Sequence, residues 1–233
     1  GYDPAYAYEL ATIVRDGIER MWHGDGEDLL YYITLYNENY AMPAKPAGVD
    51  EGIVRGLYRL AEAPALGKRG IPARLVGSGS ILNEVVKARD LLAERYGVAA
   101  EVYSATSFQL LRRDALLAER WNLRNPGAAA RVPYVASLLG AEGGPIVAAT
   151  DWIRALPDMV REWLPADYVT LGTDGFGRSD TRESLRAFFE VDAAHIAAAT
   201  LARLARSGTI PAKTAIEAAK ALGVDPKRDA PFA

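Results

Sequence analysis

Few side chains in this sequence have the type and spacing that catalysis or metal binding requires. The chain has no cysteine and only two histidines, His23 and His195. The lack of cysteine excludes disulfides, thiolate catalysis and Cys-ligated zinc. His195 lies in an alanine-rich apolar stretch, which favours a packed histidine with satisfied hydrogen bonds. His23 stands near Asp25, Glu27 and Asp28, so an adventitious metal site is the one chemistry that its neighbours suggest.

Two glycine-rich turns offer backbone sites instead. Gly24–Gly26 (GDG) resembles a magnesium-binding turn, but a predicted helix precedes it and residues 50–58 contain no Asn to complete the oxygen ligands. We therefore interpret it as a solvated turn. Gly77–Ser80 (GSGS) stands between a predicted strand and a predicted helix, where free amides and the helix dipole attract anions. Leu82 occupies the position of the third glycine of a dinucleotide fingerprint. The simpler interpretation is that the small residues allow close packing of the helix.

The acidic residues near the third quarter of the chain do not form a convincing catalytic set. Asp174, Asp180 and Glu183 could pair for acid–base work, but Asp180 and Glu183 have the spacing of a helix cap. Arg178 and Arg182 could neutralise them or face a partner. The sequence also contains neither a G-x-S-x-G elbow nor an H-E-x-x-H helix. Spacing alone therefore reveals no complete active site.

The composition narrows the class of protein. A formal net charge of −3 argues against a basic nucleic-acid surface, and no apolar run is long enough for a membrane span. The N-terminus has no signal-peptide pattern. It begins with Gly1 rather than Met, which suggests a cleaved or trimmed chain. The absence of cysteine fits the reducing cytoplasm, so we expect a cytoplasmic globular protein.

The first 48 residues are predicted to contain one helix and one strand. Asp3 and Pro4 have the types expected of an N-cap and a first helical residue, and apolar residues then recur at helical spacing as far as Trp22. Leu29–Leu35 is predicted to be a short strand. A proline-rich crossover follows, and we place a domain boundary after residue 48. The segment 1–48 is too short to form a core of its own.

From residue 49 onward strands alternate with helices, and the tail is helical. The predicted strands are Ala73–Gly77, Glu101–Ala105, Pro145–Ala149 and Tyr168–Leu171. The predicted helices are Ile81–Tyr96, Phe108–Trp121, Trp152–Trp163 (interrupted by Pro157), Ser184–Phe189, Ala193–Ser207 and Ala212–Leu222. Thr106 is the predicted N-cap of the second helix, and Gly97, Gly208 and Gly223 are predicted stops. This order predicts an α/β fold with a mostly parallel sheet and helices on both faces.

Three long segments closely resemble the homodimeric pyruvate dehydrogenase family, the decarboxylating component of the pyruvate dehydrogenase complex. They are Tyr31–Pro43 (YYITLYNENYAMP), Tyr103–Asn122 (YSATSFQLLRRDALLAERWN) and Leu171–Asp192 (LGTDGFGRSDTRESLRAFFEVD). The third segment is similar, more loosely, to transketolase C-terminal domains. One departure is visible: relatives often carry a histidine before the position of Pro126, where this chain has Leu123–Asn125, which puts a local surface contact in doubt.

The resemblance implies an enzyme that uses thiamine diphosphate and magnesium to decarboxylate pyruvate. Such an enzyme acetylates the lipoyl group of dihydrolipoyl acetyltransferase and is a homodimer. By this template residues 1–48 are the end of the pyrimidine-binding middle domain with its linker. Residues 49–233 are then a transketolase-like C-terminal domain.

In this family the cofactor-binding and catalytic motifs belong to parts that precede the position of Gly1. We therefore expect no catalytic, cofactor-binding or metal-binding residue here, and no cofactor bound by this chain alone. The segment nearest the catalytic cleft is expected to be Asn37, Glu38, Asn39 and Tyr40. The chain itself is expected to be structural, dimer-stabilising and partner-docking. The alternative is a stand-alone module that binds an anion or nucleotide at the Gly77–Ser80 turn.

Overall fold

The computed structural model describes residues 1–23, 25–67, 70–141, 143–165 and 167–232. Its strands are β1 (Tyr58–Ala61), β2 (Ile71–Gly77), β3 (Val98–Ser104), β4 (Ile146–Ala149) and β5 (Tyr168–Leu171). Its α-helices are α1 (Ala7–Trp22), α2 (Asp50–Arg55), α3 (Leu82–Tyr96), α4 (Phe108–Arg124), α5 (Tyr134–Leu139), α6 (Ala155–Asp158), α7 (Arg182–Phe188), α8 (Ala193–Arg206) and α9 (Ala212–Ala221). The described residues also include the 3-10 turns η2 (Gly79–Ile81) and η3 (Arg161–Trp163).

The described strands form one sheet in the order β1-β3-β2-β4-β5. β1 is antiparallel to β3, and the other neighbouring pairs are parallel. The chain passes from β2 through α3 to β3 on one side, and then returns to place β4 on the other side of β2. The direction of winding therefore reverses between β2 and β4, which makes their carboxyl ends a topological switch point.

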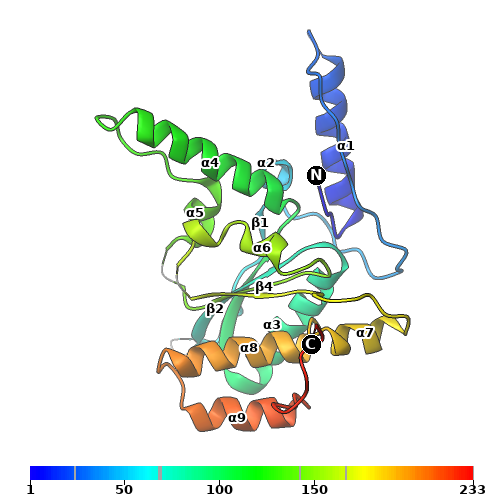
Figure 1. Ribbon diagram of the computed structural model, residues 1–233, viewed down its shortest axis with the longest axis vertical. Coiled ribbons are helices and arrows are strands. Elements are labelled where there is room, and N and C mark those ends of the chain that lie inside the picture. The colour runs from blue at the N-terminus through cyan, green and yellow to red at the C-terminus, as the bar shows by residue number, and fades with distance from the viewer. Residues whose placement is uncertain (24, 68–69, 142, 166, 233) are drawn as a thin grey trace.

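Helices cover both faces of the sheet, as the sequence predicted (Figure 1). Alternate residues of each strand point to opposite faces. On β2, Leu75 belongs to the apolar core beneath α3 and α8, whereas Val76 belongs to the core beneath α4 and α5. On β4, Val147 and Ala148 divide in the same way. The mostly parallel sheet with two covered faces is thus confirmed.

Residues 1–49, which precede α2, pack against the part of the chain that contains the sheet. α1 projects away from the sheet, as does the C-terminal part of α4 (Figure 1). Ile13 of α1 is fully buried and packs with Ile53 of α2 and Tyr58 of β1. Glu9, also fully buried, accepts hydrogen bonds from the hydroxyls of Tyr58 and Ser104, each at 2.6 Å. The start of α1 is therefore anchored to the edge of the sheet.

The predicted strand Leu29–Leu35 is wrong. The segment is extended, but its β-type contact is a single bridge between Ile33 and Tyr2. The Tyr2 amide donates to the Tyr32 carbonyl at 2.8 Å, and the Thr34 amide donates to the Tyr2 carbonyl at 3.0 Å. A strand needs a continuous partner for its backbone groups, and in the described part of the chain Tyr2 alone supplies one.

Three predicted N-caps are also wrong. α1 begins at Ala7 rather than beside Asp3, because the Glu9 carboxylate takes the amides of Ala5 and Tyr6. Ser107, not Thr106, caps α4, and Thr181, not Asp180, caps α7; each hydroxyl accepts the amide three residues later. Thr106 instead donates to the Ile53 carbonyl at 2.6 Å.

The remaining comparisons with prediction concern helix ends and short elements. Gly97, Gly208 and Gly223 have positive φ at helix ends, as predicted. The predicted helix Trp152–Trp163 is reduced to α6 and η3, two short turns. α2, α5 and β1 were not predicted. Each has at most six residues, too few for a periodic pattern to stand out.

Candidate functional site

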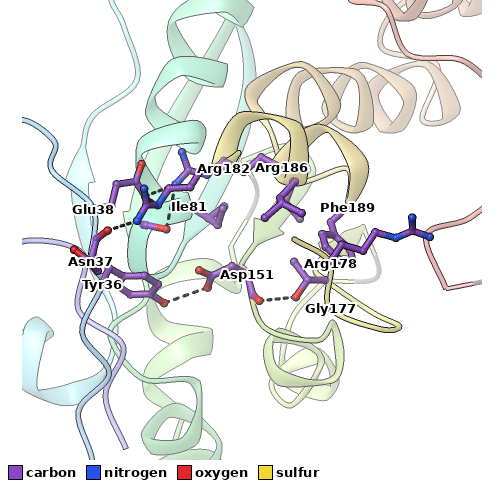
Figure 2. A pocket seen from close by; sticks show the side chains of 14 residues that line it. Tyr36, Asn37, Glu38, Ile81, Asp151, Gly177, Arg178, Arg182, Arg186 and Phe189 are labelled. Atoms are coloured by element: carbon purple, nitrogen blue, oxygen red, sulfur yellow. Dashed lines mark hydrogen bonds and ion pairs between the residues drawn. The ribbon is translucent and has the colours of Figure 1, made fainter. Parts of the chain in front are cut away.

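A cavity with several charged lining residues lies at the switch point of the sheet. It has a volume of about 310 Å³ and opens beyond the carboxyl ends of β2, β4 and β5. Ser80 follows β2, Asp151 follows β4 and Thr173 follows β5. Tyr36 and Glu38 enter from the N-terminal segment, and α7 closes the far side (Figure 2). Ligands of open α/β sheets bind at this kind of crevice, so we treat it as the candidate site.

One end of the site is built around the Tyr36 hydroxyl. It lies 2.6 Å from Asp3 Oδ1. It also lies 3.1 Å from Asp151 Oδ1 (Figure 2). Burial raises the pKa of Asp151 to about 6, and the nearby negative charge of Asp3 adds to that rise. Burial likewise raises the pKa of Tyr36, again with a contribution from both carboxylates. The phenol therefore stays protonated and acts as the hydrogen-bond donor.

Glycine is required where Tyr36 crosses the turn after β2. Gly79 has φ +50°, and a Cβ atom there would lie 2.2 Å from the Tyr36 hydroxyl oxygen. The Gly79 amide donates to the Asp3 carbonyl at 3.2 Å. Gly77 is equally crowded, because a Cβ would meet the Cα of Leu82 at 2.8 Å. The small residues of the turn thus allow close packing, the simpler of the two sequence interpretations.

The same contacts bear on the predicted anion site at Gly77–Ser80. The Gly79 amide is already bonded within the chain, and Tyr36 lies directly over the turn. Anion binding by this turn stays a prediction, and an incoming anion would have to displace the phenol. Arg186 donates to Ser80 Oγ at 3.3 Å, so this serine is also engaged.

The other end of the site is a wall formed by ion pairs between arginines of α7 and nearby glutamates. Arg186 donates to Glu38 Oε2 at 2.5 Å and lies 3.5 Å from Glu84. Arg182 donates to the Asn37 carbonyl, and its Nε lies 3.7 Å from Glu38. Because Arg186 and Glu38 are both largely buried, their attraction is less screened than that of a surface pair. This wall fixes the segment that contains Glu38 against α7.

The sequence-predicted segment 37–40 is only partly brought into the cavity. Asn37 and Glu38 line it, and Asn39 lines the open groove next to it, between α3 and α7. Tyr40 does not line either space. Its hydroxyl donates to the Ala5 carbonyl at 2.5 Å, and its ring meets Tyr6 edge-on. Its position supports a structural role.

Sequence reasoning missed Asp3, Tyr36, Asp151 and Arg186. Asp151 could have been found, because it comes two residues after a predicted strand that ends at the ligand-binding edge of a parallel sheet. No local pattern marks the other three, since they come from unrelated segments.

The remaining candidate residues have structural surroundings. His195 Nδ1 lies 2.7 Å from Asp192, the N-cap of α8, which confirms a satisfied histidine. Asp174 accepts the Arg154 guanidinium at 2.6 Å. Of the GDG turn, Gly24 lies outside the described residues. The described residues contain no cluster of three His, Cys, Asp or Glu side chains suited to a metal ion. Nor does any described helix have the length and apolar character needed to cross a membrane.

The residues of the site can hold chain segments together and can share a proton. Among the described residues of the site, however, no nucleophile is placed beside a general base. Of the charged groups of the cavity, Glu38, Arg182 and Arg186 are paired with one another or bound to backbone, whereas Asp151 contacts the Tyr36 hydroxyl. The chemistry that these residues support is recognition and positioning.

Comparisons with known proteins match the chain in two parts. Residues 56–192 match the sequence model of the transketolase-like TK C-terminal domain family. Residues 1–43 match that of the pyruvate dehydrogenase E1 component middle domain.

Curated relatives are similar along the whole chain. The pyruvate dehydrogenase E1 component of Pseudomonas aeruginosa is 46% identical over 99% of this chain and 26% of its own length. The Escherichia coli K12 E1 component is 48% identical over 96% of this chain and 25% of its own length. That of Mycolicibacterium smegmatis is 44% identical over 96% of this chain. The chain thus spans about a quarter of the length of these relatives.

Among solved structures, a transketolase from Pichia stipitis in complex with sedoheptulose 7-phosphate has a similar fold. The TM-score is 0.60 and the identity is 19%, over 89% of this chain and 25% of the transketolase.

Proposed function

Because the chain belongs to the transketolase-like C-terminal domain family and is homologous along its length to pyruvate dehydrogenase E1 components, we propose that it works as part of such an E1 enzyme. That enzyme would use thiamine diphosphate and magnesium to decarboxylate pyruvate, and would acetylate the lipoyl group of dihydrolipoyl acetyltransferase. Identity of 42–48% across nearly the whole chain carries the proposal. We expect the enzyme to act in the cytoplasm.

Within that enzyme the chain has a structural role. Residues 1–48 are the end of the pyrimidine-binding domain with its linker, and residues 49–233 are the C-terminal domain. The contacts of Glu9 with β1 and β3, and of Glu38 with α7, support a rigid junction between the two. We expect the cofactor-binding residues to lie in the parts of the enzyme that this chain does not span.

Exposed apolar side chains on the N-terminal segment support a dimer-stabilising and partner-docking role. On α1, Val14, Ile18 and Trp22 are 42%, 54% and 80% exposed, and Leu30 after it is 93% exposed. Contiguous exposed apolar surface usually marks an interface. We assign this face to the remainder of the E1 enzyme or its second subunit. Solution mass of the isolated chain tests the assignment, because a well-behaved monomer would contradict it.

A chimera tests the function. The chain would replace the matching quarter of the Escherichia coli E1 component, and pyruvate-dependent acetylation of the lipoyl group would be measured with its own acetyltransferase. We expect activity comparable to that of the parent. A folded dimeric chimera with no activity would overturn the proposal. As a second measurement, calorimetry with thiamine diphosphate and magnesium should show no tight binding to the isolated chain. Tight binding would contradict the structural role.

A further inference from the structure

The Tyr36 hydroxyl lies between two carboxyl groups that come from different segments, one buried and one partly buried. Asp3 belongs to the N-terminal segment, and Asp151 follows β4. Asp3 Oδ1 also accepts the Thr34 hydroxyl at 2.6 Å. Asp3 is 7% exposed, and its Oδ2 atom is buried without a hydrogen-bond partner. The Asp3 carboxylate is therefore shielded from water, whereas Tyr36 and Asp151 are partly buried and border the cavity.

The charged groups around this cluster neutralise it only in part, because Arg186 lowers the pKa of Asp151 by less than burial and Asp3 raise it. Glu38 approaches from the N-terminal segment, and Arg178, Arg182 and Arg186 approach from α7 and the loop before it. Arg186 is held by Glu38 and Ser80, and Arg182 by Glu38 and the Asn37 carbonyl.

Arg178 stacks on the Phe188 ring at 4.1 Å, and its guanidinium points away from the cavity (Figure 2). Across the described ranges of the chain, no basic side chain lies within ion-pair distance of Asp3 or Asp151. The two carboxyls thus have Tyr36 between them and no cation in contact.

The number of hydrogens available decides which groups of this cluster donate hydrogen bonds and which accept them. A phenol carries one hydrogen, so Tyr36 can donate to one carboxylate only. The shorter contact, to Asp3, takes that hydrogen. The 3.1 Å contact to Asp151 then brings two oxygen acceptors together, unless Asp151 supplies a hydrogen of its own. A buried acceptor without a donor is costly.

We propose that Asp151, Tyr36 and Asp3 form a proton-dependent latch, in which a protonated Asp151 donates to Tyr36 and Tyr36 donates to Asp3. The latch holds residues 34–38 over Gly79 and the switch point of the sheet. When the proton leaves, two carboxylates face one phenol, the contact between Asp151 and Tyr36 is lost, and Tyr36 is held less firmly over the turn, while the ion pairs of Glu38 with α7 remain. The proton goes to solvent through the cavity beside Asp151, and no covalent bond changes.

The range of pH in which the latch works follows from the surroundings of Asp151. Burial and the charge of Asp3 raise its pKa to about 6. A carboxyl whose folded-state pKa is raised contributes stability that is complete below the unfolded value of 3.8 and is lost as pH rises through about 6. The latch is therefore closed at pH 5 and open at pH 8.

Hydrogen–deuterium exchange of the 233-residue chain tests the proposal, with rates corrected for the intrinsic effect of pH. In the wild type, the amides of Thr34 and Gly79, which donate to the Tyr2 and Asp3 carbonyls, should exchange about tenfold or more faster at pH 8 than at pH 5, since one pKa unit corresponds to a factor of ten. Asp151→Asn keeps a donor that does not titrate, so exchange should stay slow at both values. Tyr36→Phe removes the link and should exchange quickly at both.

Asp90→Asn, at an exposed site on α3, is the matched control and should behave as the wild type. The ¹³Cγ resonance of Asp151, assigned by its loss in the Asn variant, gives a second measurement and should titrate near pH 6. Equal pH dependence in wild type and Asp151→Asn would overturn the latch. So would fast exchange of Asp151→Asn at pH 5, or a ¹³Cγ resonance that titrates near 3.8, the usual value for an aspartate.

Discussion

The carboxylate of Glu9, in the first turn of α1, accepts a 2.6 Å hydrogen bond from the hydroxyl of Ser104, the last residue of β3. The same carboxylate accepts the Tyr58 hydroxyl and the amides of Ala5 and Tyr6. Burial raises the pKa of Glu9, and these hydrogen bonds offset part of the rise. One buried side chain thus starts a helix and attaches it to two strands.

Glu9→Gln should lower the free energy of unfolding by about 1–3 kcal/mol, the usual cost of leaving buried polar groups unsatisfied. The carboxamide that replaces the carboxylate would place an NH₂ group against hydroxyl or amide groups that are themselves donors. At least one hydrogen bond of the carboxylate is therefore lost. Urea unfolding measures the change. Glu94→Gln, at an exposed position on the same kind of element, is the control and should change stability by less than about 0.5 kcal/mol. Equal effects of the two substitutions would show that Glu9 is not an anchor.

Gly79→Ala should destabilise the chain more than Gly97→Ala. Both glycines have positive φ, which costs an alanine about 1–2 kcal/mol. At Gly97 an added methyl group would lie in open space, whereas at Gly79 it would meet the Tyr36 hydroxyl at 2.2 Å. We expect the difference between the two variants to be at least about 1 kcal/mol in urea unfolding, in line with the cost of overpacking. No difference would mean that Tyr36 is not fixed over the turn.

Arg186→Met should cost about 2 kcal/mol, because it leaves the largely buried carboxylates of Glu38 and Glu84 with less compensation. The measurement is again the midpoint of urea unfolding. Arg112→Met, at an exposed position of α4, is the control, because it makes the same substitution at a residue outside the ion pairs of the cavity. The expectation fails if both variants unfold at the same midpoint.

Glu190→Gly should stabilise the chain by up to about 1 kcal/mol. Glu190 has φ +60°, the one positive value among the described residues that are not glycine, and glycine adopts this conformation without strain. Thermal unfolding should show a higher midpoint for the Gly variant. Glu190→Ala removes the carboxylate but keeps the strain, so it should not show this gain. A similar gain in both variants would assign the effect to charge instead.

Hydrophobic patterning was enough to predict the main elements of the sheet. β2, β3, β4 and β5 lie within three residues of their predicted limits, because a buried parallel strand is a continuous apolar run bounded by turns. Cap positions were less predictable. Thr106 and Ser107 are both chemically able to cap α4, and the backbone conformation at Ser107 decides between them.

The predicted strand Leu29–Leu35 failed for a related reason. Its apolar and aromatic residues are typical of a strand, but strand formation depends on a neighbour that the segment itself does not encode. Tyr2 offers one bridge, and Leu30, Tyr32 and Leu35 are left exposed.

The sequence by itself determined the α/β class, the order of the main strands and helices along the chain, and the kinship with pyruvate dehydrogenase E1 components. These depend on local periodicity and on long collinear segments. The tertiary structure alone decided which groups share the cavity. Tyr36 lies 33 positions from Asp3 and 115 positions from Asp151. They meet because the crossovers bring the carboxyl ends of β2 and β4 together beneath the N-terminal segment, and no local pattern specifies that distance.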